Sequence, residues 1–235
     1  MQNLSTRSLA LVALVSLIFG FGGAALWSVS GLGHSQTREY LLDNPKILPD
    51  LVANWEKQQA QERLANVAGE VTKPFPGAVL GNPNGTVTLV EFTDYGCTFC
   101  RMSRENVEAL TAANPDLKVV IREWPIFQGS DAAAKMALAA AKQGKFREFH
   151  EAMFDNGPPN EDNIMSAAAI AGIDLALAQQ FVSSQEADFE LAQNMTMARN
   201  LGFTGTPSWV VGGEVIEGAV GEERLQEAID AARDS

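Results

Sequence analysis

Apolar and polar positions follow two different periods in the last two thirds of the chain. Nearly continuous apolar or β-branched runs predict strands at residues 78–80, 86–93, 117–124, 208–211 and 215–216. The last two flank Gly212-Gly213 and so predict a hairpin. Helical patterns occupy residues 102–113, 131–141, 145–154, 163–171, 174–183, 187–201 and 222–232. This order predicts an α/β domain over residues 76–235, with a helical insertion at about residues 129–201.

The amino-terminal part of the chain has a different pattern. Arg7 precedes an uncharged apolar stretch at residues 9–27, which is close to the about 20 residues that span a bilayer and ends in Trp27 as an interfacial anchor. A cleaved signal peptide is the alternative, with Gly23-Ala24-Ala25 as the cleavage site. Residues 1–30 are therefore interpreted as a signal anchor or a signal peptide. Both interpretations predict export to the periplasm, either tethered to the inner membrane by residues 9–27 or soluble after cleavage.

Residues 35–68 predict a helical arm between this segment and the α/β domain. A short helix is expected at residues 37–42 and a longer one from Pro45 to about Val67. The longer helix carries an apolar stripe at helical spacing, formed by Ile47, Leu48, Leu51, Val52 and Trp55. The stripe either packs on the chain's own domain or mediates self-association.

The chemistry-bearing residues lie between the strand at 86–93 and the helix that follows. Cys97 and Cys100 are the only cysteines in the chain and are separated by two residues. A C-x-x-C at a strand-to-helix junction is typical of thioredoxin-like redox sites. The unpaired N–H groups and the dipole of a helix start favour a thiolate. We therefore expect Cys97 to be exposed and nucleophilic, and Cys100 to be more buried and to resolve the mixed disulfide.

Three other interpretations of the cysteine pair are available. A structural disulfide would close a very short loop and add little stability. A structural zinc site needs four ligands, and neither a second C-x-x-C nor a nearby histidine is present in the sequence, since His34 and His150 are distant. Two inert cysteines are difficult to reconcile with the turn at Gly96 and the helix start.

The net charge of the chain indicates which classes of partner it is unsuited to bind. The formal net charge is −12, which argues against binding to nucleic acid or to anionic lipid surfaces. Apolar residues make up 46% of the chain, which is sufficient for a substantial core.

Taken together, these motifs resemble the DsbA-like family of exported thiol–disulfide oxidoreductases, over about residues 81–232. The landmarks are residues 81–85, Val90 to Tyr95, the C-x-x-C, residues 143–146, Phe149-His150 and Leu201 to Pro207. The resemblance implies a thioredoxin fold with an inserted helical domain. Residues 38–45 look like the N-terminal arm of the oligomeric suppressor-of-copper-sensitivity branch, in which the arm mediates self-association. It therefore suggests a homo-oligomer formed through residues 37–66.

The resemblance also assigns roles by position. Cys97 matches the nucleophile and Cys100 the resolving cysteine of a redox-active disulfide. Pro207 matches a proline in a cis peptide bond facing the active site, so that Thr206 pairs with the substrate backbone like a strand. Glu91, six residues before Cys97, matches a buried acid that accepts the Cys100 proton. No cofactor is implied and no metal, since the cysteine pair carries the electrons.

The residues between the cysteines depart from the family's strong oxidants. Those proteins hold Pro-His there, whereas this chain has Thr98-Phe99, which supply no positive charge to stabilise the thiolate. The sequence therefore favours an isomerase or a reductase over a dedicated disulfide oxidase. Expected partners are cysteine-containing exported proteins and a membrane redox partner. A copper-handling thiol protein and an adaptor that docks through its arm are the non-enzymatic alternatives.

Overall fold

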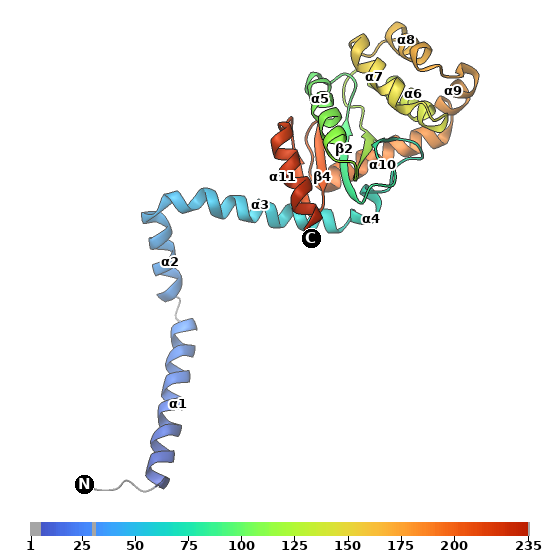
Figure 1. Cartoon of the computed structure of the whole chain (residues 1–235). Coiled ribbons are helices and arrows are strands. Elements are labelled where there is room, and N and C mark those ends of the chain that lie inside the picture. The colour runs from blue at the N-terminus through green and yellow to red at the C-terminus, as the bar shows by residue number, and fades with distance from the viewer. Residues whose placement is uncertain (1–5, 30–31, 235) are drawn as a thin grey trace. The chain divides into compact units, whose positions relative to one another are not determined.

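The computed structural model describes residues 6–29 and 32–234 of the 235-residue chain, with side chains over residues 11–27 and 36–234 (Figure 1). It contains two compact units, one up to Glu56 and one from Lys57 onward.

The first unit is helical. Its elements are α1 (Thr6–Val29), α2 (Leu32–Asp43), the short 3-10 helix η1 (Pro45–Ile47) and the first part of α3 (Leu48–Ala65). The helices expected at residues 37–42 and from Pro45 are confirmed, and Leu48, Leu51, Val52 and Trp55 of the stripe are exposed. Among the residues that the structure describes, no helix combines the length and the apolarity needed to cross a membrane. The predicted tether at residues 9–27 therefore gains no support from the structure.

The second unit is built on a mixed five-stranded sheet. The strands are β1 (Val79–Gly81), β2 (Val87–Thr93), β3 (Leu117–Glu123), β4 (Ser208–Val211) and β5 (Glu214–Glu217). They lie in the order β1-β3-β2-β4-β5, and only β2 and β3 are parallel. Every strand expected from the sequence is present, and the thioredoxin-like α/β fold is confirmed. The central position of β2 places the C-x-x-C motif at the middle of one sheet edge.

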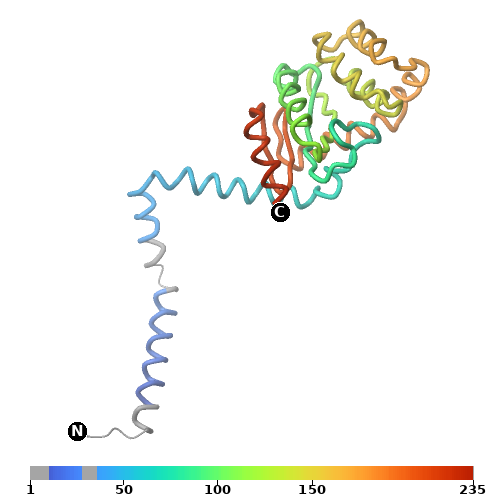
Figure 2. Tube along the Cα trace, in the orientation of Figure 1, coloured from blue at the N-terminus to red at the C-terminus, as the bar shows by residue number. Residues whose placement is uncertain are grey.

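Helices cover both faces of this sheet. They are α4 (Ala68–Val71), α5 (Thr98–Ala113), α6 (Ser130–Lys142), α7 (Phe146–Asn156), α8 (Glu161–Ala171), α9 (Leu175–Val182), α10 (Gln185–Leu201) and α11 (Glu222–Arg233). The helical block between β3 and β4 is thus confirmed. In Figure 2 the yellow-to-orange trace of α6 to α9 gathers at one end of the unit. Asn160, Asp174 and Ser184 cap α8, α9 and α10 through their side-chain oxygens, which fixes where these helices begin.

Successive residues of the central strands point to opposite faces and build two cores. On one face Leu89, Ile121 and Trp209 pack with α5, α11 and the helical block. On the other face Phe92 and Val210 pack with the end of α3, α4 and α10. Burying side chains of this size is worth roughly 1.5–3 kcal/mol each.

The end of α3 belongs to the second core. Leu64 and Val67 are buried there, and Arg63 Nε donates to the main-chain oxygen of Leu201 at 2.9 Å. A cation that bonds the last carbonyls of α10 complements the negative end of the helix dipole. The arm segment after Glu56 therefore stabilises the α/β unit directly.

Candidate active site

Cys97 lies at the start of α5, where β2 ends. It is the N-cap residue with extended backbone, and Cys100 sits in the first helical turn. Both thiols are free and buried, with Cys97 4% exposed and Cys100 fully inaccessible. Helix α5 begins at Thr98, earlier than the expected Met102, so the helix start lies directly at the first cysteine. The expected exposure of Cys97 is wrong.

A loop from far along the sequence covers the Cys97 thiol. Strand β4 pairs with β2 in the register Phe92 opposite Ser208, which brings the residues before β4 alongside the C-x-x-C motif. The Cys97 Sγ donates to the main-chain oxygen of Thr206 at 3.2 Å. The Thr206–Pro207 peptide bond is cis, as the family resemblance implied. The structure thus brings Cys97, Cys100, Thr206 and Pro207 together in one site.

Asp94 organises the turn before Cys97, and the sequence analysis assigned it no role. Its Oδ1 accepts from the Gly96 N–H at 2.6 Å, and its Oδ2 accepts from the N–H groups of Ile126 and Phe127 at 2.6 and 2.9 Å. Carboxylate acceptors make strong hydrogen bonds to backbone N–H groups. One side chain therefore joins the cysteine turn to the loop after β3.

Gly96 is required by the close packing of this turn. A Cβ at this position would lie 2.8 Å from the Ser130 Oγ and 2.9 Å from the Phe127 Cβ. Both distances are shorter than real Cβ contacts. The loop after β3 and the start of α6 therefore pack directly against the backbone beside Cys97.

Large apolar side chains are exposed around the thiol. Phe99, between the cysteines, is 59% exposed and Met102, in the next turn, is 61% exposed. Ile126 and Phe127, which Asp94 holds beside Gly96, are also exposed. We call these four residues the apolar rim. Exposed apolar side chains gathered in one place indicate an interaction surface.

Glu91 lies on β2 beneath the site and is 2% exposed. Burial raises the pKa of its carboxyl to about 8, which the Thr93 side chain partly counteracts. Burial also raises the pKa of the Cys100 thiol, and the nearby Glu91 charge raises it further. Glu91 and Cys100 therefore interact electrostatically, and each is favoured in its protonated form near neutral pH.

A second group of buried polar side chains lies next to Glu91 and was missed from the sequence. The Tyr95 hydroxyl is 3.0 Å from Glu123 Oε1 and 3.0 Å from His150 Nδ1. Burial raises the pKa of Glu123 and of Tyr95, and it lowers the pKa of His150 to about 3. Phe149-His150 was used only as a family landmark. A histidine at helical spacing with Phe146 and Met153 on the apolar face of a helix was the signal in the sequence.

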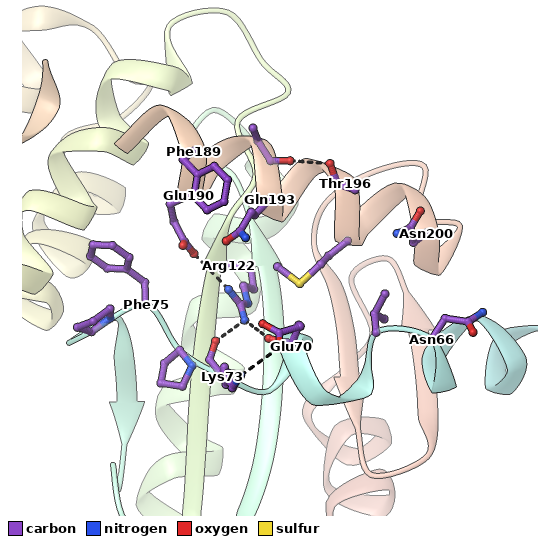
Figure 3. A pocket seen from close by; sticks show the side chains of 15 residues that line it. Asn66, Glu70, Lys73, Phe75, Arg122, Phe189, Glu190, Gln193, Thr196 and Asn200 are labelled. Carbon is purple, nitrogen blue, oxygen red and sulfur yellow. Dashed lines mark hydrogen bonds and ion pairs between the residues drawn. The ribbon is translucent and has the colours of Figure 1, made fainter. Parts of the chain in front are cut away.

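A cavity of about 530 Å³ lies elsewhere, between α4, the Pro74–Pro76 segment and α10. Figure 3 shows Arg122 at its centre, with its guanidinium directed toward the main chain of Glu70 and Lys73 and toward the Glu190 carboxylate. Neither cysteine lines this cavity, nor does Thr206. Its central cation is occupied by protein acceptors, so the cavity belongs to the packing of the unit and not to the thiol site.

Metal binding is the remaining question for the site. Among the side chains that the structure describes, no group of three or more His, Cys, Asp and Glu residues is arranged to hold a metal ion. The geometry instead consists of two thiols at a helix start, a facing main-chain oxygen and a buried acid. This arrangement on a thioredoxin-like sheet is typical of sites of thiol–disulfide exchange.

Comparison with known proteins defines the family. Residues 88–230 match the model of the DSBA-like thioredoxin domain, and the chain belongs to this family. A thioredoxin-like oxidoreductase from Silicibacter pomeroyi DSS-3 is 43% identical, with a TM-score of 0.64 over 67% of this chain and 92% of that one. A periplasmic thioredoxin-like protein from Salmonella enterica serovar Typhimurium is 25% identical, with a TM-score of 0.63 over 72% and 97% of the two chains.

Curated relatives are much longer than this chain. A Na(+)/H(+) antiporter NhaA 1 from Salinispora arenicola is 25% identical over 158 residues, which are 66% of this chain and 24% of that protein. The chain thus spans about a quarter of the length of the first curated relatives it matches. The antiporter activity in their names belongs to those proteins.

Proposed function

We propose that this protein exchanges disulfides with cysteine-containing exported proteins, with Cys97 as the nucleophile and Cys100 as the resolving cysteine. The observation that carries the proposal is the position of Cys97 Sγ, at the start of α5 and 3.2 Å from the Thr206 main-chain oxygen. Helix N-terminal N–H groups stabilise a thiolate, and the Thr206 main-chain oxygen accepts from the Cys97 S–H while the thiol is protonated.

The reaction follows from the two thiols. The Cys97 thiolate attacks one sulfur of a substrate disulfide, so that a mixed disulfide forms and the other substrate sulfur leaves as a thiolate. A second substrate thiol then displaces Cys97, which isomerises the substrate. Alternatively Cys100 attacks Cys97, which releases a reduced substrate and leaves the Cys97–Cys100 disulfide. In that step Glu91, in its ionised form, accepts the proton of Cys100.

Substrate recognition is proposed to combine backbone pairing and apolar contact. Thr206, at the entry to β4, offers main-chain groups beside the sulfur, where an extended substrate segment pairs as a strand does. The apolar rim then contacts the substrate's apolar side chains. These side chains are exposed in incompletely folded proteins, which are the substrates of disulfide exchange.

The direction of exchange is proposed to favour isomerisation or reduction over oxidation. Thr98-Phe99 brings no cation to the thiolate, so the reduced form is less stabilised than in strong oxidants. The exposed stripe on α3 supports self-association, because apolar side chains in such a row are normally covered. Several active sites in one assembly would hold a misfolded substrate between breakage and re-formation of a bond.

The periplasm is the proposed location. The uncharged stretch at residues 9–27 supports export, and one structural relative is described as periplasmic. Residues 9–27 either anchor the chain or are removed on export. The mass of the protein recovered from cells distinguishes these outcomes. A membrane redox partner would restore the working redox state.

Substitution of each cysteine tests the enzymatic proposal. Cys100→Ser should accumulate a mixed disulfide with a scrambled substrate protein, because the first attack proceeds and its resolution does not. Cys97→Ser should form none and should lose refolding activity. Met102→Leu, which keeps an apolar residue on the rim, is the matched control. Full activity of Cys97→Ser would contradict the proposal.

Self-association is tested separately on the arm. A chain that begins at Ser35 should have an oligomeric mass in solution, and the double variant Leu51→Glu/Trp55→Glu should be monomeric with its thiol exchange intact. Ala53→Glu, which adds charge on the exposed opposite face of α3, is the control. A monomeric parent chain would remove self-association and leave Thr98-Phe99 as the remaining support for isomerisation.

A further inference from the structure

A line of three buried polar side chains leads away from the cysteines across the interior. Glu123 at the end of β3, Tyr95 after β2 and His150 on α7 are each at most 2% exposed. The Tyr95 hydroxyl is 3.0 Å from a Glu123 oxygen on one side and 3.0 Å from the His150 Nδ1 on the other. Rings of Phe149 and Phe154 enclose the Tyr95 ring. Burying polar groups inside an apolar cluster costs free energy unless they are hydrogen-bonded. Such a buried line therefore suggests a role beyond packing.

The inner end of this line lies beside the acid beneath Cys100. The parallel register of β2 and β3 pairs Thr93 with Glu123, and Glu91 lies two residues before Thr93 on the same face. Glu91 is close enough to raise the pKa of Glu123. Glu123 Oε2 and Thr93 Oγ1 are buried and find no hydrogen-bond partner among the residues that the structure describes. Glu123 therefore has an oxygen free to receive a proton from the Glu91 side.

The outer end of the line lies at the surface. His150 lines a cavity of about 170 Å³ together with charged residues of α5 and α7, namely Arg104, Arg147, Glu151 and Asp155. The side chain of Asp155 is 65% exposed, and those of Arg147 and Glu151 are about half exposed. The buried imidazole therefore meets a cavity whose walls are in contact with solvent.

We propose that Glu123, Tyr95 and His150 form a proton pathway that connects Glu91, beneath Cys100, with solvent at the cavity beside His150. The pathway rests on the proposed function, since its role is to carry away the proton that Cys100 loses. It adds three positioning residues to the site and assigns a use to the 170 Å³ cavity.

The proton balance is closed at each step. The Cys100 S–H bond breaks, Cys100 bonds to Cys97, and the substrate leaves with the electron pair of its broken S–S bond. The released proton passes to Glu91 in its ionised form and then, by way of the Thr93 hydroxyl, to the free Glu123 oxygen. The Tyr95 hydroxyl, which donates to Glu123 at rest, then turns to donate to His150 Nδ1. Protonated Glu123 gives the Tyr95 oxygen a proton from Oε1 as the Tyr95 hydroxyl proton moves to His150 Nδ1. His150 releases the proton on its second nitrogen into the cavity, so one proton enters the line and one leaves it.

The charges around the pathway favour the passage of a proton over its retention on His150. Burial and the charges of Asp94 and Glu91 favour a protonated Glu123, although its bond from Tyr95 opposes this. Arg104 on α5 and Arg147 on α7 face His150 and disfavour a standing positive charge there. Glu151 and Asp155 on α7 line the cavity and provide acceptors for the departing proton. Cys100 on α5 is the group at the inner end that titrates with Glu91.

Dithionitrobenzoate is the disulfide probe, and its reaction with the full chain releases a coloured thiolate in two phases. The two phases separate attack by Cys97 from attack by Cys100. The first coloured thiolate reports attack by Cys97, and the second reports attack by Cys100. Tyr95→Phe keeps the ring and removes the hydroxyl. It should leave the first phase within twofold of the wild type and slow the second by about 10- to 100-fold. Phe154→Leu, which trims the same aromatic cluster without touching a polar group, should leave both phases unchanged.

A chemical rescue distinguishes a pathway from a packing effect. His150→Ala should show the same slow second phase, and added imidazole should restore it, whereas 1-methylpyrrole, a flat aromatic five-membered ring without a basic nitrogen, should not. Equal second phases in Tyr95→Phe and the wild type would overturn the pathway, as would equal slowing of both phases or rescue by 1-methylpyrrole. Absence of both phases in the wild type would instead refute the proposed function.

Discussion

Arg122 and Glu123 are neighbours on β3, and each places a buried ionisable group on one face of the sheet. The two groups differ in how completely they are hydrogen-bonded. Arg122 directs its guanidinium to the main-chain oxygens of Glu70, Val71 and Lys73, to the Glu190 carboxylate and to the Asn194 amide oxygen. Glu123, on the other face, has one oxygen bonded by Tyr95 and one oxygen without a partner among the described residues.

The difference separates a structural ion from a group to which we assign proton transfer. Arg122 stays charged in the interior because acceptors from two segments surround it, so it holds α4 and α10 against the sheet. Glu123 accepts a hydrogen bond from Tyr95, and only the Thr93 side chain counteracts the burial of Glu91, so burial raises the pKa values of both carboxyls and favours their neutral forms. Complete hydrogen bonding thus accompanies the packing role of Arg122, and weaker compensation accompanies the two acids near the proposed redox site.

Substitution of Arg122, whose guanidinium is hydrogen-bonded on all sides, should have the largest effect on stability. Arg122→Met keeps the volume but leaves three main-chain oxygens and the Glu190 carboxylate without their donor. We expect the free energy of unfolding to fall by about 3–5 kcal/mol. Denaturant unfolding measures this loss. Arg147→Met, at an exposed pair with Glu151, is the control and should change stability by less than about 0.5 kcal/mol. A small effect of Arg122→Met would contradict the structural role.

On the face that carries Glu91, the free energy of unfolding should depend on pH. The folded-state pKa of Glu91 is about 8, against an ordinary value of 4.5, so the folded chain holds a proton that the unfolded chain loses between these pH values. The contribution of this group is therefore intact below pH 4.5 and is lost as the pH rises to about 8. The slope is at most about 1.4 kcal/mol per pH unit.

Glu91→Gln should abolish that slope. The stability of the variant relative to the wild type should rise by roughly 2–4 kcal/mol between pH 5 and pH 8, with both proteins reduced. Urea unfolding at the two pH values measures the difference. Glu105→Gln, at an exposed position on α5, should show no such rise. A constant difference would mean that Glu91 is charged in the folded state.

Asn194 connects the two faces, and its removal should have the smallest of these effects. Its amide oxygen accepts from Arg122, and its Nδ2 donates to the main-chain oxygen of Glu123 at 3.1 Å. Asn194→Ala should cost about 1–3 kcal/mol of unfolding free energy, because two buried partners lose their bond. Thermal and denaturant unfolding check it against Gln193→Ala, an exposed neighbour. Equal stability of the two variants would disprove the bridging role.

Much of the fold was predictable because its elements carry local patterns. The apolar runs of β2 and β3 and the Gly212-Gly213 turn predicted the sheet correctly. The start of α5 was placed too late, because Thr98 and Phe99 are weak helix formers and the N-cap is a cysteine. The end of α3 was assigned to the arm, since nothing local shows that Leu64 and Val67 pack under the sheet.

The site was predictable only where a short motif carried it. The C-x-x-C spacing indicated Cys97 and Cys100, and the family resemblance indicated Thr206, Pro207 and Glu91. The exposure of Cys97 was wrong because the covering loop lies 109 residues away in sequence. Glu123, Tyr95 and His150 were missed for the same reason. Each looks like an isolated polar residue in its own segment, and only the strand register and the packing of α7 bring them together.

The pairing of β4 with β2 also has a consequence for synthesis and export. A chain that crosses a membrane from its amino terminus presents both cysteines well before residue 206 has followed, and the β2–β4 contact must close the long loop between them, at an entropic cost. Until then the cysteines form an ordinary dithiol, open to any oxidant in the compartment. Arrival of β4 covers Cys97 and completes the site, so a chain interrupted before this strand carries the C-x-x-C motif without the complete site.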